Sequence, residues 1–319
     1  MEVIIPPIKT EILLSELTKD KFVRKTNYGN NEVYIFSNND SPNLMLEVGR
    51  LREIAFRDAG GGTGKAVDID EYDLSEKGFK QLIVWDPYLK EIVGGYRFIH
   101  GKDLEFDENG NLTGATGELF KFSEKFIKEY LPKSIELGRS FIQPKYQAAA
   151  ATRKGIFSLD NLWDGLGAVI VDNPDVNYFF GKFTMYKTYN IKARDILLFF
   201  LKKYFPNKEN LAVPYEPVLP VYNEKEFEQL FNKHSYIEDR KILIAELKKY
   251  GEFIPPLVNA YMNLSSTMHT FGTAINYHFG GVEETGILVD IRDIYPSKKH
   301  RHIQTYKKND FEHRAKASI

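Results

Sequence analysis

The alternation of hydrophobic and polar positions along the chain predicts a mixture of helices and strands without an internal repeat. Segments with apolar residues near every third or fourth position predict helices at 43–60, 119–132, 159–171, 193–205, 224–233 and 237–250. Short apolar or alternating segments predict strands at 80–86, 91–100, 134–142 and 176–185, the first two forming a hairpin. The order of these elements indicates an α+β fold with a mostly antiparallel central sheet and interleaved helices.

The composition limits the classes of protein to consider. With 319 residues, 43% of them hydrophobic, the chain can bury a sizeable core, and its net charge of −1 gives no reason to expect a nucleic-acid partner. The absence of cysteine excludes disulfides, thiolate metal ligands and a cysteine nucleophile, and fits a reducing compartment. The N-terminus does not resemble a signal peptide, and the densest apolar run, 196–201, is too short to span a bilayer. We therefore expect a cytoplasmic protein.

The glycine-rich sequence GGGTGK at 60–65 invites comparison with a phosphate-binding loop. A P-loop has serine or threonine after the lysine and lies between a strand and a helix, whereas Ala66 follows here and a predicted helix precedes. We predict a flexible or ligand-covering loop instead of a nucleotide site. Four acidic residues follow the loop, Asp68, Asp70, Glu71 and Asp73. They could bind a metal ion, hold a cationic substrate or form a solvated cluster.

The predicted strand at 134–142 carries two charged residues, Glu136 and Arg139, among apolar ones. Strict alternation places Glu136 on one face with Gly138, and Leu137 with Arg139 on the other. Because Gly138 has no side chain, we expect room for a ligand beside Glu136, and partial burial would favour its use as a general base. A structural salt bridge is the alternative.

Other charged residues leave both a structural and a functional interpretation open. Arg97 alternates with apolar neighbours, which is typical of an edge residue with its guanidinium in water. A group of basic residues could form either a solvated face or a docking surface for an acidic partner protein. Its members are Lys182, Lys187, Lys192, Arg194, Lys202 and Lys203, with Arg153 and Lys154 upstream. The seven histidines lack the spacing of a metal site or of a Ser-His-Asp triad, so we expect no bound metal.

Four short motifs, in this order, resemble those of GNAT-fold acyltransferases that depend on acyl-carrier protein. They are RLREIAF, DIDEYD, GGYRF and ELGRS. Acyl-homoserine lactone synthases have an Arg and a Phe four apart on a helix, a D-x-x-D pair, a strand arginine and an E-x-[ST]-R strand. The matching positions here are Arg52, Phe56, Asp70, Asp73, Arg97, Glu136 and Arg139, with Gly138 where that family has a hydroxyl.

The chain more closely resembles the hemolysin-like N-acyltransferases, which include ornithine lipid and glycine lipid synthases. The strand ELGRS is intact, and LWDGLG at 162–167, YFFGKFTMY at 178–186 and a C-terminal block at 254–291 also match. Within that family the segments RLREIAFRDAGGGTGKAVDIDEYD at 50–73 and LDNLWDGLGA most resemble the glycine lipid branch. The resemblance implies an N-terminal extension at 1–42, a GNAT-like domain at 43–292 with a helical insertion at 206–250, and a basic C-terminal tail at 293–319.

The resemblance also implies a reaction, the transfer of a (3-hydroxy)fatty acyl group from acyl-carrier protein to the amino group of glycine. The sheet would splay into a V-shaped wedge between 134–142 and 176–185, and the 4′-phosphopantetheine arm of the carrier would enter it. No bound cofactor is expected. Coenzyme A is a less favoured donor because the glycine-rich pyrophosphate loop of coenzyme A-using GNAT enzymes is missing.

Roles for individual residues follow from the same resemblance. Glu136 would be the general base, with backbone N–H groups near 139–143 stabilising the oxyanion. The amino acid would be bound, and its site ordered, by Arg52, Phe56, Asp70, Asp73, Arg97 and Arg139. The arm and acyl chain would contact Ser140, Phe141, Ile142, Gln143, Trp163, Phe179 and Phe180. The carrier protein would dock on Arg153, Lys154, Lys187, Arg194, Lys202 and Lys203.

Two rival functions remain open. The first is N-acylation of ornithine or lysine, whose second cation would be held by Asp70 and Asp73. The second is a non-catalytic lipid-binding protein that contacts the inner membrane face peripherally, since the basic tail and its aromatic residues could touch anionic lipid.

Overall fold

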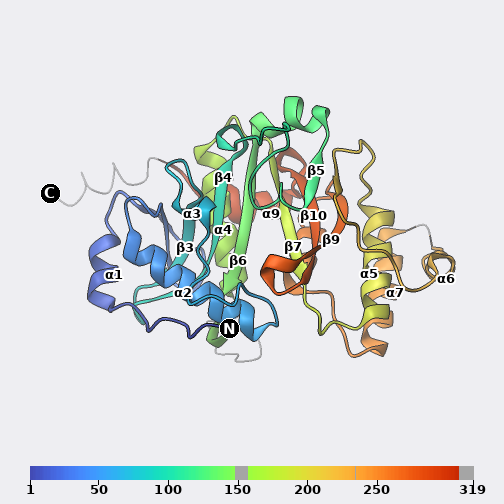
Figure 1. The fold of residues 1–319 in the computed structure, drawn as a ribbon, viewed down its shortest axis with the longest axis horizontal. Coiled ribbons are helices and arrows are strands. Elements are labelled where there is room, and N and C mark those ends of the chain that lie inside the picture. Colours follow the sequence, from blue (N-terminus) through green and yellow to red (C-terminus); the bar gives the residue numbers. More distant parts are fainter. Residues whose placement is uncertain (148–156, 234, 309–319) are drawn as a thin grey trace. The chain divides into compact units, whose positions relative to one another are not determined.

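A computed structural model describes residues 1–147, 157–233 and 235–308 (Figure 1). The chain divides into two compact units. The first unit comprises Met1–Asp103, Ile135–Asn177 and Ile294–Ile319, and the second comprises Leu104–Ser134 and Tyr178–Asp293. The wedge predicted between residues 134–142 and 176–185 involves both units and stays a prediction.

The first unit contains an antiparallel sheet whose described strands follow the order β1-β2-β3-β4-β6. These strands are β1 (Phe22–Lys25), β2 (Glu32–Phe36), β3 (Lys80–Asp86), β4 (Glu91–His100) and β6 (Ser134–Ile142). The α-helices are α1 (Thr10–Glu16), α2 (Pro42–Asp58), α3 (Glu71–Leu74), α4 (Ser158–Asp172) and α9 (Pro296–Lys298). Tighter or wider helical turns occur at η1 (Gly101–Asp103), η4 (Pro144–Tyr146) and η9 (Lys299–Ile303).

Helices α2 and α4 cover opposite faces of this sheet. On one face Arg52 of α2 donates a hydrogen bond to Gln81 of β3, and on the other Gly165 of α4 lies against the side chain of Leu82. Neighbouring residues of a strand point to opposite faces. A Cβ at Gly165 would approach Leu82 Cδ2 to 2.8 Å, so this glycine permits the close packing of the predicted helix at 159–171.

The described part of the predicted basic tail packs against α4. A Cβ at Gly167 would lie 2.1 Å from the backbone oxygen of His302, and His302 Nδ1 lies 2.7 Å from Asp164 Oδ1. Arg301 is paired with Asp160 at 2.5 Å. This segment up to residue 308 therefore belongs to the folded first unit, and the pairing of Arg301 weakens the proposal that a basic tail contacts lipid.

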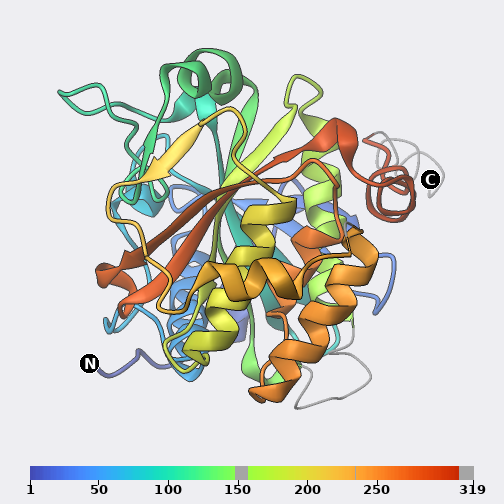
Figure 2. The ribbon, with the colours of Figure 1, turned by 90° about the vertical axis from the view of Figure 1, so that its right-hand side faces the viewer.

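The second unit contains the antiparallel strands β7-β10-β9 and a separate pair, β5 and β8. The strands are β5 (Phe120–Phe122), β7 (Tyr178–Met185), β8 (Ala212–Pro214), β9 (His269–Asn276) and β10 (Val282–Asp290). The α-helices are α5 (Ile191–Tyr204), α6 (Glu224–Leu230), α7 (Tyr236–Lys249) and α8 (Pro256–Met262). Short helical turns lie at η2 (Phe126–Tyr130), η3 (Leu131–Lys133), η7 (Tyr277–Phe279) and η8 (Ile291–Asp293). Figure 2 shows α5 and α7 side by side in this unit.

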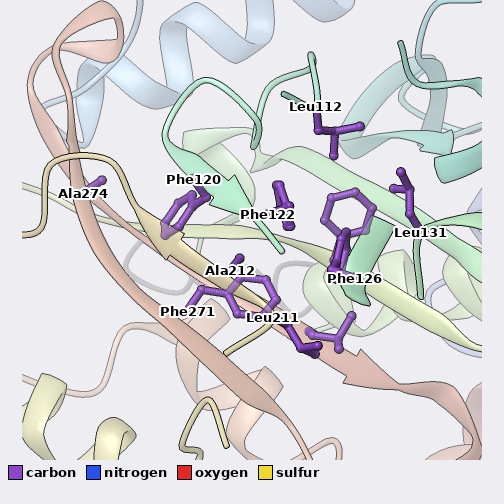
Figure 3. Close-up of a cluster of buried hydrophobic side chains, with 11 residues drawn as sticks. Leu112, Phe120, Phe122, Phe126, Leu131, Leu211, Ala212, Phe271 and Ala274 are labelled. Carbon is purple, nitrogen blue, oxygen red and sulfur yellow. The ribbon is translucent and has the colours of Figure 1, made fainter. Parts of the chain in front are cut away.

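The helix predicted at 119–132 is confirmed only in part. Its first residues form strand β5, whereas a helical stretch that includes η2 and η3 covers 124–133. Phe122 of β5 stacks on Phe126 of η2 at 4.4 Å between ring centroids, and both lie beside Phe180 of β7. Figure 3 shows this cluster, and its buried members are Leu112, Phe120, Phe122, Phe126, Leu131, Phe180, Leu211, Ala212, Phe271, Ala274 and Leu288. The pairing of β5 with β8 supplies the backbone hydrogen bonds that a helix would otherwise have provided.

Candidate active site

Strand β6 departs from regular geometry in the motif ELGRS. Arg139 has a φ of +49°, and the pairing with β4 joins Gly95 to Phe141 but Arg97 to Gly138. Two residues of β6 therefore oppose one residue of β4, which is a β-bulge. A bulge changes the direction of the side chain that it contains, and β-bulges are common next to active sites.

The bulge places Arg139 in contact with acidic residues on the α2 face of the sheet. Its Nε donates to Asp68 Oδ1 at 3.1 Å, and its Nη2 lies 3.6 Å from Asp70 Oδ2. Strict alternation had put Arg139 on the face opposite Glu136. That prediction is wrong because the left-handed backbone at Arg139 interrupts the alternation.

Arg97 lies at the centre of a buried network of charges. Its Nη1 donates to Asp70 at 2.7 Å and to Asp73 at 3.0 Å, and its side chain is 1% exposed. Arg52 donates to Asp73 at 3.1 Å, and Gln81 Nε2 donates to the other oxygen of Asp73 at 2.9 Å. The expectation of an edge arginine in water is therefore wrong. Cross-strand pairing buries Arg97, and carboxylates from the α3 segment neutralise it.

The balance of burial and charge differs between Asp68 and Asp70. Burial opposes ionisation of Asp70, but the charge and hydrogen bonds of Arg97, with help from Arg139 and Arg52, lower its pKa. For Asp68, burial is the larger effect and raises the pKa despite the nearby arginines. The three arginines and three aspartates balance in charge, so the network needs no further ion to be neutral.

Glu136 shares a sheet face with this network. It pairs with Ile99 on β4, two residues along from the Arg97–Gly138 pair and so on the same face, and is 1% exposed. A Cβ at Gly138 would lie 3.4 Å from Arg97 Nε, an ordinary contact, so the arginine borders the space beside this glycine. Room for a ligand beside Glu136 stays a prediction.

The glycine-rich loop at 60–65 donates hydrogen bonds to a carboxylate of the chain itself. Glu53 of α2, which is buried, accepts hydrogen bonds from the backbone N–H groups of Thr63 at 3.0 Å and Gly64 at 2.8 Å. The Thr63 hydroxyl and Arg57 donate to the same carboxylate. These loop donors are therefore already used, which disfavours the predicted ligand-covering role.

The residues predicted to contact the donor arm and acyl chain lie in different environments. Phe141, Trp163 and Phe179 are buried, whereas Ser140 and Ile142 are half-buried on β6. Gln143 is held against β4 by its backbone N–H, which donates to Val93 O at 2.9 Å. Phe180 belongs to the aromatic cluster of Figure 3, and alternation on β7 points Phe179 to the opposite face. The two phenylalanines therefore cannot line one wall together.

Several predicted docking residues are bound by acidic neighbours. Arg194 is 10% exposed and contacts Asp195 and Glu283, each at 2.6 Å. Lys203 lies 3.0 Å from Asp239, and Lys202, which is 70% exposed, lies 3.1 Å from Glu224. Lys187 is exposed. Arg153 and Lys154 lie outside the described residues.

Sequence reasoning missed Gln81, which connects Arg52 to Asp73. A polar residue at the start of an apolar strand was the only signal. Within the described residues no group of three or more His, Cys, Asp or Glu side chains is arranged to hold a metal ion. No helix in the same residues is long and apolar enough to cross a membrane.

An acetyltransferase (GNAT) domain matches residues 51–154, which include the second half of α2, the aspartates and strand β6. The protein is an acyltransferase with a GNAT domain.

Two bacterial proteins named glycine N(alpha)-acyltransferase are similar along almost their whole length. The one from Bacteroides thetaiotaomicron is 56% identical over 306 residues, covering 96% of this chain and 91% of that protein. The one from Phocaeicola vulgatus is 56% identical over 308 residues, covering 97% of this chain and 94% of that protein. The chain belongs to the glycine N(alpha)-acyltransferase family.

Two solved structures also match. One is the CoA-dependent acyl-homoserine lactone synthase BjaI with SAM and isopentyl-CoA, at 10% identity and a TM-score of 0.35, covering 86% of this chain and 87% of that one. The other is the AHL synthase LasI, at 11% identity and a TM-score of 0.36, covering 82% and 91%. Similarity at this level carries no argument about the site.

Proposed function

We propose that the chain transfers a fatty acyl group, such as a 3-hydroxyacyl group, from acyl-carrier protein to the amino group of glycine. The observation that carries this proposal is the 56% identity, over 96% of the chain, to an enzyme named for N-acylation of glycine. The carrier-protein donor is supported by the sequence resemblance to the hemolysin-like family and by the lack of a glycine-rich pyrophosphate loop after β6.

In this proposal Glu136 removes a proton from the glycine ammonium, directly or through a water, since only the neutral amine is nucleophilic. The amine nitrogen then bonds to the thioester carbonyl carbon, the C–S bond breaks, and the phosphopantetheine thiol leaves with a proton. Direct transfer is favoured because the chain has no cysteine to form a thioester intermediate.

The β-bulge of β6 supports a role for this strand in binding the thioester. An extra residue in one strand leaves backbone groups outside the regular ladder, and N–H groups there can donate to a developing oxyanion. We propose Ser140, which lies in the bulge, as the source of such a donor. Gln143 is less suitable because its N–H already donates to Val93.

The charge network supports a structural role for the other motif residues of this site. Arg52 and Arg97 are fully buried and each contacts Asp73, so we propose that they fix α2, α3 and β4 around Glu136, with Phe56 packed beside them on α2. The same pairing disfavours ornithine or lysine as acceptor. Asp70 and Asp73 are already engaged by arginine, and a second cation would have to displace it.

For carrier docking we propose Lys187 and Lys202, which are exposed, together with Arg153 and Lys154. Arg194 and Lys203 remain part of the proposed surface, but their charges are partly neutralised by Asp195, Glu283 and Asp239.

The test uses purified protein, an equimolar mixture of glycine, ornithine and lysine, and either 3-hydroxyacyl-carrier protein or the matching acyl-coenzyme A. Mass spectrometry of the extracted lipid should find N-acylglycine as the main product and faster formation with the carrier protein. Predominant acylation of ornithine or lysine would reject the acceptor, and equal or faster turnover with coenzyme A would reject the donor.

A further inference from the structure

The second unit contains a polar cluster that the proposed mechanism does not use. Lys182 of β7 lies 3.2 Å from Glu284 of β10, and Thr184 donates to the same carboxylate at 3.2 Å. Asn276 of β9 donates to Glu284 through Nδ2 at 2.8 Å. The side chains of Lys182 and Glu284 are 8% and 4% exposed. We call these four residues the Lys182–Glu284 site.

One hydrogen-bond acceptor in this site has no partner among the described residues. Asn276 Oδ1 is buried and accepts no hydrogen bond, although Nδ2 of the same amide is bonded. A buried acceptor without a donor is destabilising, and a buried ion pair contributes little net stability after desolvation. The cluster is therefore better explained by a ligand than by stability alone.

The site lies on the less covered face of β7. Counted with their backbone atoms, Lys182 and Thr184 are half-buried. The residues that alternate with them point to the other face and are buried, namely Gly181, Phe183 and Met185. Lys182 also donates to the backbone oxygen of Ala115, which fixes its ammonium over the strand. The polar positions thus continue the face that begins with the aromatic cluster at Phe180.

An amino-acid acceptor has a carboxylate that needs a cation, and the arginines of the first unit are committed elsewhere. Arg52, Arg97 and Arg139 are all paired with aspartates. Lys182 and Glu284 are instead paired with each other, next to the unpaired Asn276 Oδ1, so a ligand with one charge of each sign can take the place of that pair without adding net charge. This set matches a zwitterion, with the lysine facing a carboxylate, and the glutamate and Asn276 Oδ1 facing an ammonium.

We propose that the Lys182–Glu284 site binds the amino-acid acceptor, with Lys182 holding its carboxylate and Glu284 and Asn276 receiving its ammonium group. This inference rests on the proposed function. Binding would replace one ion pair by two and add no net charge. The pKa of Tyr186 is raised to about 12 by burial and by the nearby Glu284, so this side chain stays neutral and does not change the net charge of the site.

The test compares Lys182→Met with wild type in steady-state kinetics. Loss of a charge-assisted contact to the carboxylate should raise the KM for glycine about 10- to 100-fold and leave the KM for the acyl donor unchanged. Glycinamide lacks the carboxylate, so its KM should be the same for the variant and wild type. An equal rise in the KM of glycinamide, or an unchanged KM for glycine, would overturn the assignment.

The matched control is Lys21→Met in the first unit. Lys21 is 12% exposed, lies 3.5 Å from Asp40 and also donates to backbone oxygens, yet should not affect the KM for glycine. Lys182→Arg should restore much of the affinity. If Lys182→Met does not fold, Asn276→Ala replaces it, with an expected severalfold rise in glycine KM and rejection if that KM is unchanged.

Calorimetric titration of glycine into the protein separates this inference from the proposed function. Weakened binding in Lys182→Met supports the site even if the acylated product proves to differ. Normal N-acylglycine formation with equal glycine affinity in both proteins rejects the site and leaves the proposed function intact.

Discussion

Arg97 and Gly138 face each other across β4 and β6, and Arg97 Nε lies 3.4 Å, an ordinary contact distance, from the position that a Cβ at Gly138 would take. The glycine in ELGRS therefore borders a buried guanidinium. Through Arg97 it is linked to Asp70 and Asp73, and so to the helical segment that follows the glycine-rich loop.

The space at two glycines of the same strand pair predicts different tolerance of alanine. At Gly138 the added methyl group meets Arg97 at 3.4 Å, an ordinary contact, whereas at Gly94 it would lie 2.4 Å from the Phe141 backbone oxygen. Gly138→Ala should cost less than about 1 kcal/mol of unfolding free energy and Gly94→Ala about 1–3 kcal/mol. Denaturant unfolding measures both, and equal losses would contradict the packing described here.

Replacing Glu136 by glutamine should preserve folding and remove the proposed base. We expect kcat to fall about 10²- to 10⁴-fold with little change in the thermal midpoint, because the two side chains have the same shape. The assay is N-acylglycine formation over a range of pH. Activity of Glu136→Gln close to that of wild type at every pH would exclude Glu136 as the base.

Replacing Asp73, at the centre of the charge network, should lower the free energy of unfolding. Asp73 is fully buried and accepts hydrogen bonds from Arg52, Arg97 and Gln81, so Asp73→Asn leaves buried positive charge uncompensated. The expected loss is about 3–5 kcal/mol of unfolding free energy. The comparison is Asp290→Asn at a more exposed pair with Arg292, where at most about 1 kcal/mol should be lost. Similar losses at both sites would show that the network is not needed for folding.

The stabilising effect of Asp70 should depend on pH. Its pKa is lowered in the folded protein, so its contribution is complete above the unfolded value near 4 and is lost as the pH falls below it. The stability difference between wild type and Asp70→Asn should therefore be largest near pH 7 and shrink toward pH 3. Asp68, whose pKa is raised by burial, should not show this trend. Unfolding curves measured at several pH values test both, and a difference for Asp70→Asn that does not vary with pH would contradict the expectation.

Reversing two exposed charges should weaken carrier-protein binding if the docking proposal holds. Lys187→Glu combined with Lys202→Glu should raise the KM for acyl-carrier protein about 3- to 10-fold, more at low ionic strength, and leave the KM for glycine unchanged. Lys249→Glu is the control, since Lys249 is 63% exposed and also paired with a glutamate. An effect of equal size in the control would point to net charge instead of a specific surface.

The local pattern of hydrophobic and polar residues was sufficient to predict the main helices and strands. The helix predicted at 193–205 is α5, and the predicted hairpin is β3 and β4, because each buries one consistent stripe or core face. The start of the helix predicted at 119–132 was wrong because Phe122 and Phe126 are four apart, as on a helix, while Phe120 and Phe122 are two apart, as on a strand. The partner that decides between them, β8, lies far along the chain.

The candidate site was only partly predictable for a similar reason. Motif resemblance pointed to Arg52, Arg97 and Glu136, but their pairing depends on cross-strand register and on the bulge at Arg139. Gln81 carried no motif, and Lys182 was grouped with surface lysines although its partner Glu284 lies on a distant strand. Charge neutralisation between residues so far apart in sequence leaves no local pattern.

The first unit is assembled from three separate stretches of chain, and Gly167 receives the backbone of His302 from the last of them. On the ribosome, the amino-terminal stretch is therefore made long before the stretch that covers α4. This unit therefore stays incomplete until the segment that contains His302 has been synthesised. Premature termination upstream of His302 should thus yield a product marked for degradation, even though every motif of the site has already been synthesised.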